Sequence, residues 1–332
     1  MSDAIGPRLR GAELVVGGGE SLRRMSEIAE SATERLDVDL FTGTHHKTLK
    51  RLAQAGSTVD SLFLADPEVS KRVRGVVADA GNRIVDVGAE PRKNHAKSIV
   101  ADGDRALVTT AAVAAETRTK LRFDVGAAFS GDAADALADL TRTSATGDSA
   151  AIRAASDRAR AFGIVNNDPA HGVWNLSDEV RGLVTGAEHR LIVATKRLEE
   201  PEIRQLIKDA KHRGVAVTVA KQVGKGVPLH ANIVIADDAA YIGSGHLSRR
   251  VMTGGGANGR LSRELGVILE EPKVVGQLAQ ALADGKFIKQ KAVGAGMRLA
   301  AGAGRLGILG SATGGVLAAG LATTMIMHGA VE

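Results

Sequence analysis

The fold is decided by two stretches of similar sequence, His95-Ala-Lys97-Ser-Ile-Val-Ala-Asp102 and His230-Ala-Asn232-Ile-Val-Ile-Ala-Asp237. Each begins His-Ala-x, continues with four residues and ends in Asp. Side chains alternate between the two faces of a strand, so the first and third residues of each stretch should share one face. The closing aspartates fall where a strand ends and a carboxylate can bind turn amides. We therefore expect two equivalent strands, each with a polar pair at its start.

The sequence around the two stretches repeats as well. Thr109-Thr110 follows the first stretch and Gly243-Ser244 follows the second. Further on, Phe123-Asp124-Val125-Gly126 and Glu264-Leu265-Gly266-Val267 each place an acid just before an apolar segment. On both sides, amphipathic helical patterns alternate with apolar strand patterns, which indicates an α/β layered fold. Because the same order occurs twice, the sequence predicts an internal duplication.

The pattern also sets the predicted boundaries. We expect a first lobe over residues 1–145, a connector over 146–174 that is rich in Ala, Ser, Asp and Gly, and a second lobe over 175–290. We expect residues 291–332 to contain a basic flank followed by a Gly/Ala-rich C-terminal helix.

The amino-acid composition excludes some kinds of functional site. The chain has 332 residues, 44% of them hydrophobic, so each lobe can bury a core of aliphatic side chains. With no cysteine, the chain cannot form disulfides or thiolate metal sites. Aromatic residues make up only 2%, which argues against a stacking platform for single-stranded bases. A net charge of +5 favours anionic partners without choosing between phospholipid and nucleic acid.

The two ends of the chain differ. The first residues include an acid and a proline and do not resemble a signal peptide. No charged residue lies between Arg305 and Glu332, and residues 306–327 have about the length needed to span a bilayer. Within this segment small residues recur every fourth position, a spacing that lets membrane helices pair; they are Gly310, Gly314, Ala318 and Ala322. Basic residues before it suit the cytoplasmic side of a membrane.

On these residues the sequence resembles the phospholipase D superfamily, whose members carry two HxKx4D motifs, each followed by a GSxN-like turn and a later acid. The resemblance covers roughly residues 20–285. It implies two duplicated α/β lobes packed around an active site on a pseudo-twofold axis. It also implies a mechanism without metal or cofactor, in which one motif histidine forms a phosphohistidine and the other transfers protons.

The resemblance also implies a role for each matching residue. His95 and His230 would be the catalytic pair, with Asp124 orienting His95 and Glu264 orienting His230. Substrate phosphate would be bound by the remaining polar residues of the motifs and their turns, namely Lys97, Asn232, Thr110, Ser244 and His246. Asp102 and Asp237 would be structural.

Three departures from the family pattern bear on activity. Asn232 stands where the second motif normally has Lys, and an amide brings no charge to a phosphoryl oxygen. Neither turn keeps its Asn, since the second reads Gly243-Ser244-Gly245-His246. Asp124 stands where Glu is usual. Both histidines remain, so we expect retained activity.

Three functions follow as hypotheses. The first is a phosphodiester hydrolase or transferase acting on phospholipid, anchored through residues 306–327 on the cytoplasmic face of a membrane, where the tail helices could self-associate. The second is a nuclease of the same superfamily, soluble in the cytoplasm, with salt-sensitive binding. The third is a catalytically weak membrane scaffold.

Overall fold

The computed structural model describes residues 8–67, 69–87, 92–119, 122–223, 227–255 and 261–284. The chain divides into two units, Met1–Gln290 and Lys291–Glu332. The predicted membrane segment 306–327 lies in the second unit, outside the described residues. Within the described ranges, no helix has both the length and the hydropathy that crossing a bilayer requires.

The first half of the chain builds a seven-stranded sheet in the order β1-β8-β7-β6-β2-β3-β4. Its strands are β1 (Glu13–Val16), β2 (Arg35–Leu40), β3 (Asp60–Ala65), β4 (Arg83–Asp86), β6 (Ser98–Ala101), β7 (Arg105–Thr109) and β8 (Val125–Ser130). The helices of this half are α1 (Gly18–Glu30), α2 (His46–Gly56), α3 (Lys71–Ala78), α4 (Ala115–Thr119) and α5 (Asp132–Ser144). Within this sheet, only the β2–β3 and β3–β4 pairs are parallel.

The second half builds a sheet in the order β11-β10-β14-β15-β16, and β16 also pairs with β9 and β5. Its strands are β9 (Ile164–Asn167), β10 (Arg190–Ala194), β11 (Ala216–Ala220), β14 (Asn232–Ala236), β15 (Ala239–Gly243) and β16 (Leu261–Leu269), joined by β5 (Arg92–Asn94) from the first half. A small separate sheet contains β12 (Gln222–Val223) and β13 (Val227–Pro228). The helical segments are α6 (Ser149–Arg160), η1 (Pro169–His171), α7 (Asn175–Gly186), α8 (Pro201–His212), α9 (Arg249–Thr253) and α10 (Pro272–Asp284).

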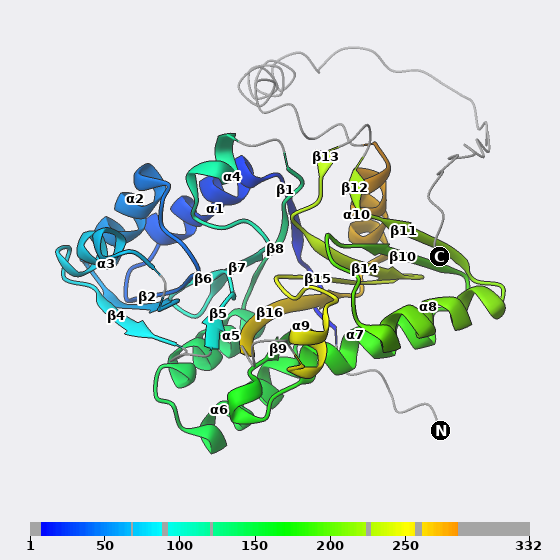
Figure 1. Cartoon of the computed structure of the whole chain (residues 1–332). Helices are drawn as coiled ribbons and strands as arrows, with labels where there is room; N and C mark the ends of the chain where they lie inside the picture. Colours follow the sequence, from blue (N-terminus) through cyan, green and yellow to red (C-terminus); the bar gives the residue numbers. More distant parts are fainter. Residues whose placement is uncertain are drawn as a thin grey trace, which may run out of the picture. The chain divides into compact units, whose positions relative to one another are not determined.

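The two sheets confirm the predicted α/β fold and its internal duplication. Strand β2 lies between β6 and the parallel β3, just as β10 lies between β14 and the parallel β11. The antiparallel pair β1–β8 has its equivalent in β9–β16. Strand β9 lies inside the range predicted as a connector, so the second copy of the pattern includes part of that range. In Figure 1, α1 and α2 lie above the first sheet, while α7 and α8 lie below the second.

Some of the helices begin at a residue whose side chain caps the first turn. The Ser70 hydroxyl accepts a hydrogen bond from the Val73 amide at the start of α3. The Asp148 carboxylate accepts from the amides of Ala150 and Ala151 at the start of α6. Such caps satisfy amides that have no partner within the helix.

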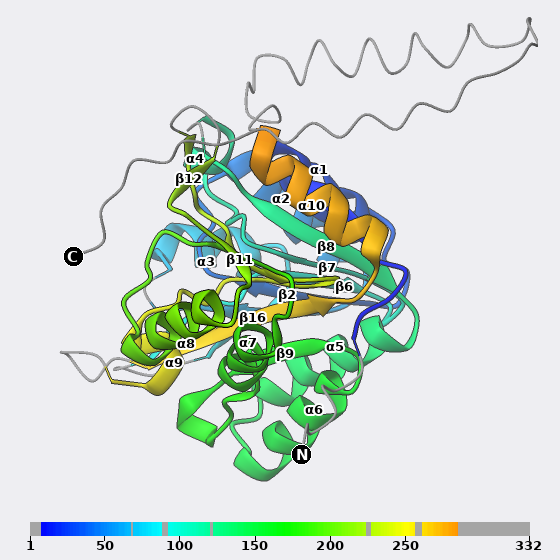
Figure 2. The same ribbon diagram turned by 90° about the vertical axis from the view of Figure 1, so that its right-hand side faces the viewer.

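Among the hydrophobic clusters of the described residues, three hold these layers together. One packs α1, α2 and α3 on the first sheet and includes Leu22 and Leu49. Another packs α7 and α8 on the second sheet and includes Leu183. The largest joins side chains of both halves, including Phe129 and Leu278. Figure 2 shows α10 on one side of the second sheet and α7 and α8 on the other. Burial of a side chain such as Leu contributes about 1.5–3 kcal/mol, so the shared cluster stabilises the packing of the two repeats in one compact unit.

The closing aspartates of the two motifs have matching roles. Asp102 and Asp237 adopt positive φ angles of 54° and 51° in the turns after β6 and β14. The Asp102 carboxylate accepts hydrogen bonds from the amides of residues 33–35, and that of Asp237 from the amides of residues 188–190. These amides lead into β2 and β10, so each aspartate ties its own turn to the start of the neighbouring strand.

Candidate active site

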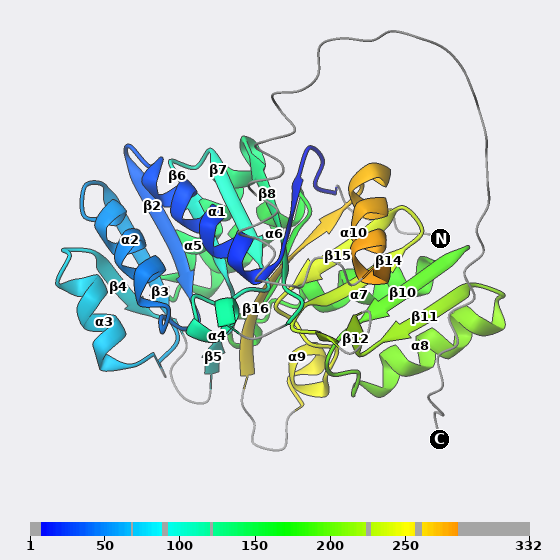
Figure 3. The same ribbon diagram turned by 90° about the horizontal axis from the view of Figure 1, so that it is seen from above.

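Two backbone contacts between the halves position the site. Strand β5 runs parallel to β16, with Asn94 opposite Arg263, and the His95 amide donates to the Arg263 carbonyl at 2.9 Å. In the other direction, Phe123 forms a bridge with Leu229, and the His230 amide donates to the Phe123 carbonyl at 3.0 Å. Figure 3 shows β5 beside β16, between the two halves of the molecule. Each histidine therefore lies beside the residue that precedes the acid of the other repeat.

The first pair is His95 with Glu264. The Nδ1 atom of His95 lies 2.8 Å from Oε2 of Glu264, which also accepts from the Ser244 hydroxyl at 2.6 Å. The other carboxylate oxygen accepts from Ser262 at 2.6 Å. Burial opposes ionisation of Glu264, but His95, Lys97 and Ser244 outweigh it and lower its pKa to about 2. The carboxylate is therefore ionised and holds Nδ1–H, which leaves Nε2 of His95 for chemistry.

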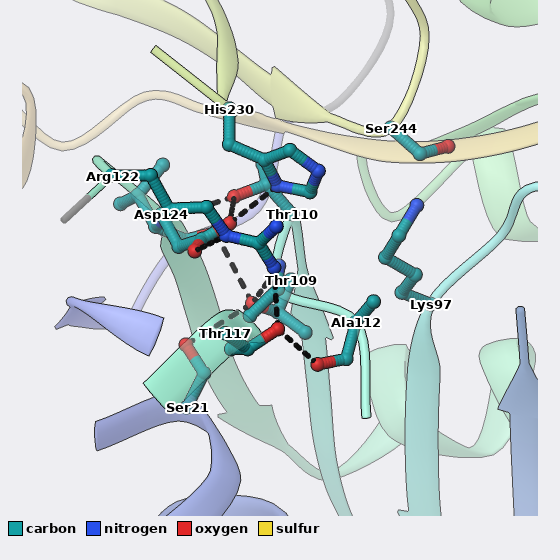
Figure 4. A network of polar contacts seen from close by, with 12 residues as sticks. Ser21, Lys97, Thr109, Thr110, Ala112, Thr117, Arg122, Asp124, His230 and Ser244 are labelled. Carbon is teal, nitrogen blue, oxygen red and sulfur yellow. Dashed lines mark hydrogen bonds and ion pairs between the residues drawn. The ribbon is translucent and has the colours of Figure 1, made fainter. Parts of the chain in front are cut away.

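The second pair is His230 with Asp124 (Figure 4). The Nδ1 atom of His230 lies 2.6 Å from Oδ1 of Asp124, and Arg122 Nε donates to Oδ2 at 3.0 Å. Burial would raise the pKa of Asp124, but His230 and Arg122 lower it. The side chain of His230 is 30% exposed and that of His95 is 18% exposed. Both rings can therefore be reached by a substrate.

This pairing corrects the expectation from the sequence. The resemblance suggested that Asp124 orients His95 and Glu264 orients His230. The structure has the opposite arrangement, since each acid binds the histidine of the other repeat. The reason is the strand crossing described above, which places the acid of each repeat across the boundary between the repeats.

The hydroxyls of Thr110 and Ser244 also have different partners from those expected. Thr110 Oγ1 donates to Asp124 at 3.3 Å and accepts from the Val125 amide at 2.9 Å. Ser244 Oγ donates to Glu264 and accepts from the Leu265 amide at 3.0 Å. A hydroxyl has one hydrogen to donate, so in this structure both bind the carboxylates and do not offer that hydrogen to a phosphate.

Lys97 lies beside His95 with its amine inside the site. Its Nζ donates to the His95 carbonyl at 2.7 Å and lies 4.8 Å from the centroid of the Phe41 ring. Burial lowers the pKa of Lys97 to about 8, although Glu264 and Asp124 act against this shift. An ammonium has three hydrogens, so Lys97 can bind a phosphoryl oxygen while it keeps the bond to His95.

Asn232 does not replace the missing lysine as a phosphate ligand. Its amide nitrogen donates to the carbonyls of Gly243 and Ser244 at 3.4 and 3.1 Å. Its oxygen lies 2.8 Å from both the Thr195 hydroxyl and Nδ1 of His246. With both amide hydrogens engaged, Asn232 is a structural residue that positions His246, contrary to the role expected from the sequence.

Sequence reasoning missed three residues of the site. Arg122 and Ser262 each precede an acid by two positions, and in an extended strand that spacing puts both side chains on one face. Gly18, the first residue of α1, lies where a Cβ atom would be 2.5 Å from the Thr117 carbonyl and 3.0 Å from Oδ2 of Asp124. The run Gly17-Gly18-Gly19 therefore includes a residue that lets α1 approach Asp124.

No group of three or more His, Cys, Asp or Glu side chains in the described ranges could hold a metal ion. Glu264 and Asp124 each bind a histidine instead.

Comparisons with known proteins agree with the fold. No family model matches the sequence, and no curated protein gives a significant match. Among solved structures, phosphatidylserine synthase of Haemophilus influenzae has a TM-score of 0.63 at 13% identity, over 85% of this chain and 86% of that protein. Polyphosphate kinase of Porphyromonas gingivalis has a TM-score of 0.61 at 14% identity, over 82% of this chain and 47% of that protein. Yeast tyrosyl-DNA phosphodiesterase has a TM-score of 0.53 at 10% identity, over 79% and 90% of the two chains.

The chain is thus a duplicated α/β protein with two histidines at the junction of its repeats. Its fold is that of the phospholipase D superfamily.

Proposed function

We propose that the protein cleaves or transfers phosphodiesters through a phosphohistidine intermediate. The observation that carries the proposal is the pair of crossed histidine–carboxylate contacts, at 2.8 Å for His95 and 2.6 Å for His230. A carboxylate on Nδ1 fixes the tautomer of a neutral imidazole and stabilises its protonated form. Two such rings supply the nucleophile and the proton donor that phosphodiester cleavage needs.

In the first step Nε2 of one histidine attacks phosphorus, the bond from phosphorus to the leaving oxygen breaks, and the second histidine gives that oxygen its proton. In the second step the histidine that donated the proton, now neutral, takes a proton from water or an alcohol. The resulting oxygen attacks phosphorus and releases the first histidine. Proton and leaving group are balanced over the two steps, and the protein returns to its starting state.

We assign the nucleophile to His95. Burial lowers the pKa of His95 and Lys97 lowers it further, although Glu264 acts in the opposite direction, so the ring favours the neutral form that a nucleophile requires. Lys97 is the cation next to it and can neutralise a phosphoryl oxygen. His230 is the more exposed ring, which suits exchange of protons with leaving and entering groups.

We propose that the substrate is phospholipid and that residues 306–327 anchor the protein in the membrane that contains it. The fold supports this choice because phosphatidylserine synthase shares it, and the uncharged tail behind a basic flank supports a membrane location. A nuclease is the alternative, since tyrosyl-DNA phosphodiesterase also shares the fold. A scaffold without turnover is the third reading, supported by the loss of the second motif lysine at Asn232.

The test uses the full chain in detergent and a chromogenic phosphodiester. We expect turnover that is lost in both His95→Ala and His230→Ala and kept in His212→Ala, a control at the exposed end of α8. Quenching with base should trap a phosphoprotein that is stable to base and labile to acid, as phosphohistidine is. A folded wild type without turnover would favour the scaffold. Parallel assays with vesicles and short oligonucleotides then separate a lipid substrate from a nucleic acid.

A further inference from the structure

The orientation of Asn232 is fixed by its neighbours. Carbonyl oxygens only accept hydrogen bonds, so the side-chain nitrogen of Asn232 must face the carbonyls of Gly243 and Ser244. Its side-chain oxygen therefore faces Nδ1 of His246, at 2.8 Å. An amide oxygen also only accepts, so Nδ1 of His246 carries a hydrogen.

That assignment determines what the other nitrogen of His246 can do. In a neutral imidazole with a hydrogen on Nδ1, Nε2 has a lone pair and accepts hydrogen bonds. Burial and the nearby His95 lower the pKa of His246 to about 3, with Lys97 adding to the shift and Glu264 opposing it, so the ring stays neutral near pH 7. His246 thus differs from the asparagine that family members carry in this turn, because an asparagine side chain also has hydrogens to donate.

The ring of His246 lies beside the proposed nucleophile. Its centroid is 5.9 Å from that of His95, with the two rings inclined by 29°. The side chain is partly exposed, and within the described ranges its Nε2 has no hydrogen-bond partner. A lone pair repels an anionic phosphoryl oxygen but attracts a hydroxyl hydrogen. The second repeat therefore presents a hydrogen-bond acceptor beside the His95 ring, whereas the first repeat presents the Lys97 ammonium.

We propose that His246 is a specificity residue that accepts a hydrogen bond from a hydroxyl group next to the scissile phosphorus, so that the protein prefers phospholipids whose headgroup carries a free hydroxyl. This inference rests on the proposed phosphodiesterase function and narrows its substrate. A headgroup without such a hydroxyl displaces water from Nε2 of His246 and offers no hydrogen in its place. The lipid is then bound less tightly, because a hydrogen bond has been lost.

The test compares vesicles of phosphatidylglycerol with vesicles of phosphatidylpropanol, using the full chain. Both lipids are anionic phosphodiesters with a three-carbon headgroup, and they differ only in the headgroup hydroxyls. We expect kcat/KM to be about tenfold higher for phosphatidylglycerol, the value of one hydrogen bond. In His246→Phe, which keeps a ring beside His95 and removes both nitrogens, the two lipids should react equally. His246→Gln retains a carbonyl acceptor and should keep part of the preference, while His212→Phe should keep all of it.

Each other outcome has a definite meaning. Equal rates on both lipids with the wild type, or a preference that survives in a folded His246→Phe, would overturn the role of His246 and leave the phosphodiesterase function intact. Turnover of the chromogenic diester or of oligonucleotides without turnover of either lipid would overturn the lipid substrate class. Absence of turnover on every phosphodiester would instead contradict the proposed function itself.

Discussion

Nδ1 of His95 lies 2.8 Å from the carboxylate of Glu264, a residue 169 positions further along the chain and in the other repeat. The reciprocal contact joins His230 to Asp124 over 106 positions. Each histidine therefore depends for its orientation on the repeat to which it does not belong. This relationship allows the roles of the two histidines to be separated by changing their acids.

We expect Glu264→Gln and Asp124→Asn to affect different steps. An amide can donate to Nδ1, which favours the tautomer with a hydrogen on Nε2 and blocks the reactive nitrogen, so kcat should fall by about 10²–10⁴-fold in both variants. A nitrophenyl leaving group needs little protonation. On a nitrophenyl diester, rapid-mixing measurements should therefore show a burst of nitrophenol in Asp124→Asn and no burst in Glu264→Gln.

The reverse pattern would make His230 the nucleophile. Ser262→Ala is a useful comparison, because it removes one hydrogen bond to Glu264 and leaves the carboxylate in place. Its effect on the rate should be much smaller than that of Glu264→Gln.

Gly18→Ala should impair the site through packing. A Cβ atom there would be 2.5 Å from the Thr117 carbonyl and 3.0 Å from Asp124 Oδ2, so α1 or the acid must shift. We expect a loss of about 1–3 kcal/mol in the free energy of unfolding, together with a lower kcat. Gly19→Ala is the matched control, since nothing lies within 4 Å of its added Cβ. Equal melting temperatures and rates for the two variants would contradict this account.

Activity should fall at high pH because of Lys97. Burial lowers the pKa of this side chain to about 8, and its charged form is the one that binds phosphate. Above pH 8 the charged fraction falls about tenfold per pH unit, and kcat/KM should follow it. In Lys97→Met the rate should be lower throughout and this alkaline limb should be absent. If the fall in rate at alkaline pH persists in Lys97→Met, another titrating group causes it.

Asp102 and Asp237 should stabilise the fold to similar extents. Because each carboxylate accepts three backbone amides, Asn at either position should cost about 1–2 kcal/mol of unfolding free energy at pH 7. Backbone hydrogen bonds lower the pKa of both groups against the effect of burial, so the stabilisation is present above the ordinary Asp pKa and is lost as the pH falls from there through the lower pKa of the folded state. Denaturant titrations should therefore show the difference from wild type shrinking below about pH 4. Asp104→Asn, at an exposed position in the same turn as Asp102, is the control.

Much of the fold could be predicted from sequence because the repeat is local. Each motif histidine is followed seven positions later by an aspartate, and the strands β6 and β14 lie between them, so the sequence alone indicates that these two strands are equivalent. The α/β class followed from the alternation of patterns. Strand β9 was missed as a strand because Asn166 and Asn167 make it read as a polar connector, although both side chains are buried in the structure.

The site was predicted less completely, because its contacts cross between the repeats. The order of the sequence suggests that each histidine pairs with the later acid of its own repeat, whereas the β5–β16 pairing brings His95 to Glu264. The role of Asn232 depends on which carbonyls surround it, and no spacing rule conveys that. Thr110 and Ser244 lie on the expected turns, but their single hydrogens are donated to the carboxylates.

The crossing of β5 and the Phe123–Leu229 bridge also constrain how such a chain could arise. Neither repeat alone contains a histidine together with its own orienting acid. A single repeat could assemble this site only by pairing with a second copy, each subunit lending its carboxylate to the other. Duplication and fusion would then leave two copies free to diverge, and in this chain the two copies differ at one matching position, which is Lys97 in the first and Asn232 in the second. Fragments separated between the repeats should accordingly be inert apart and regain function when mixed.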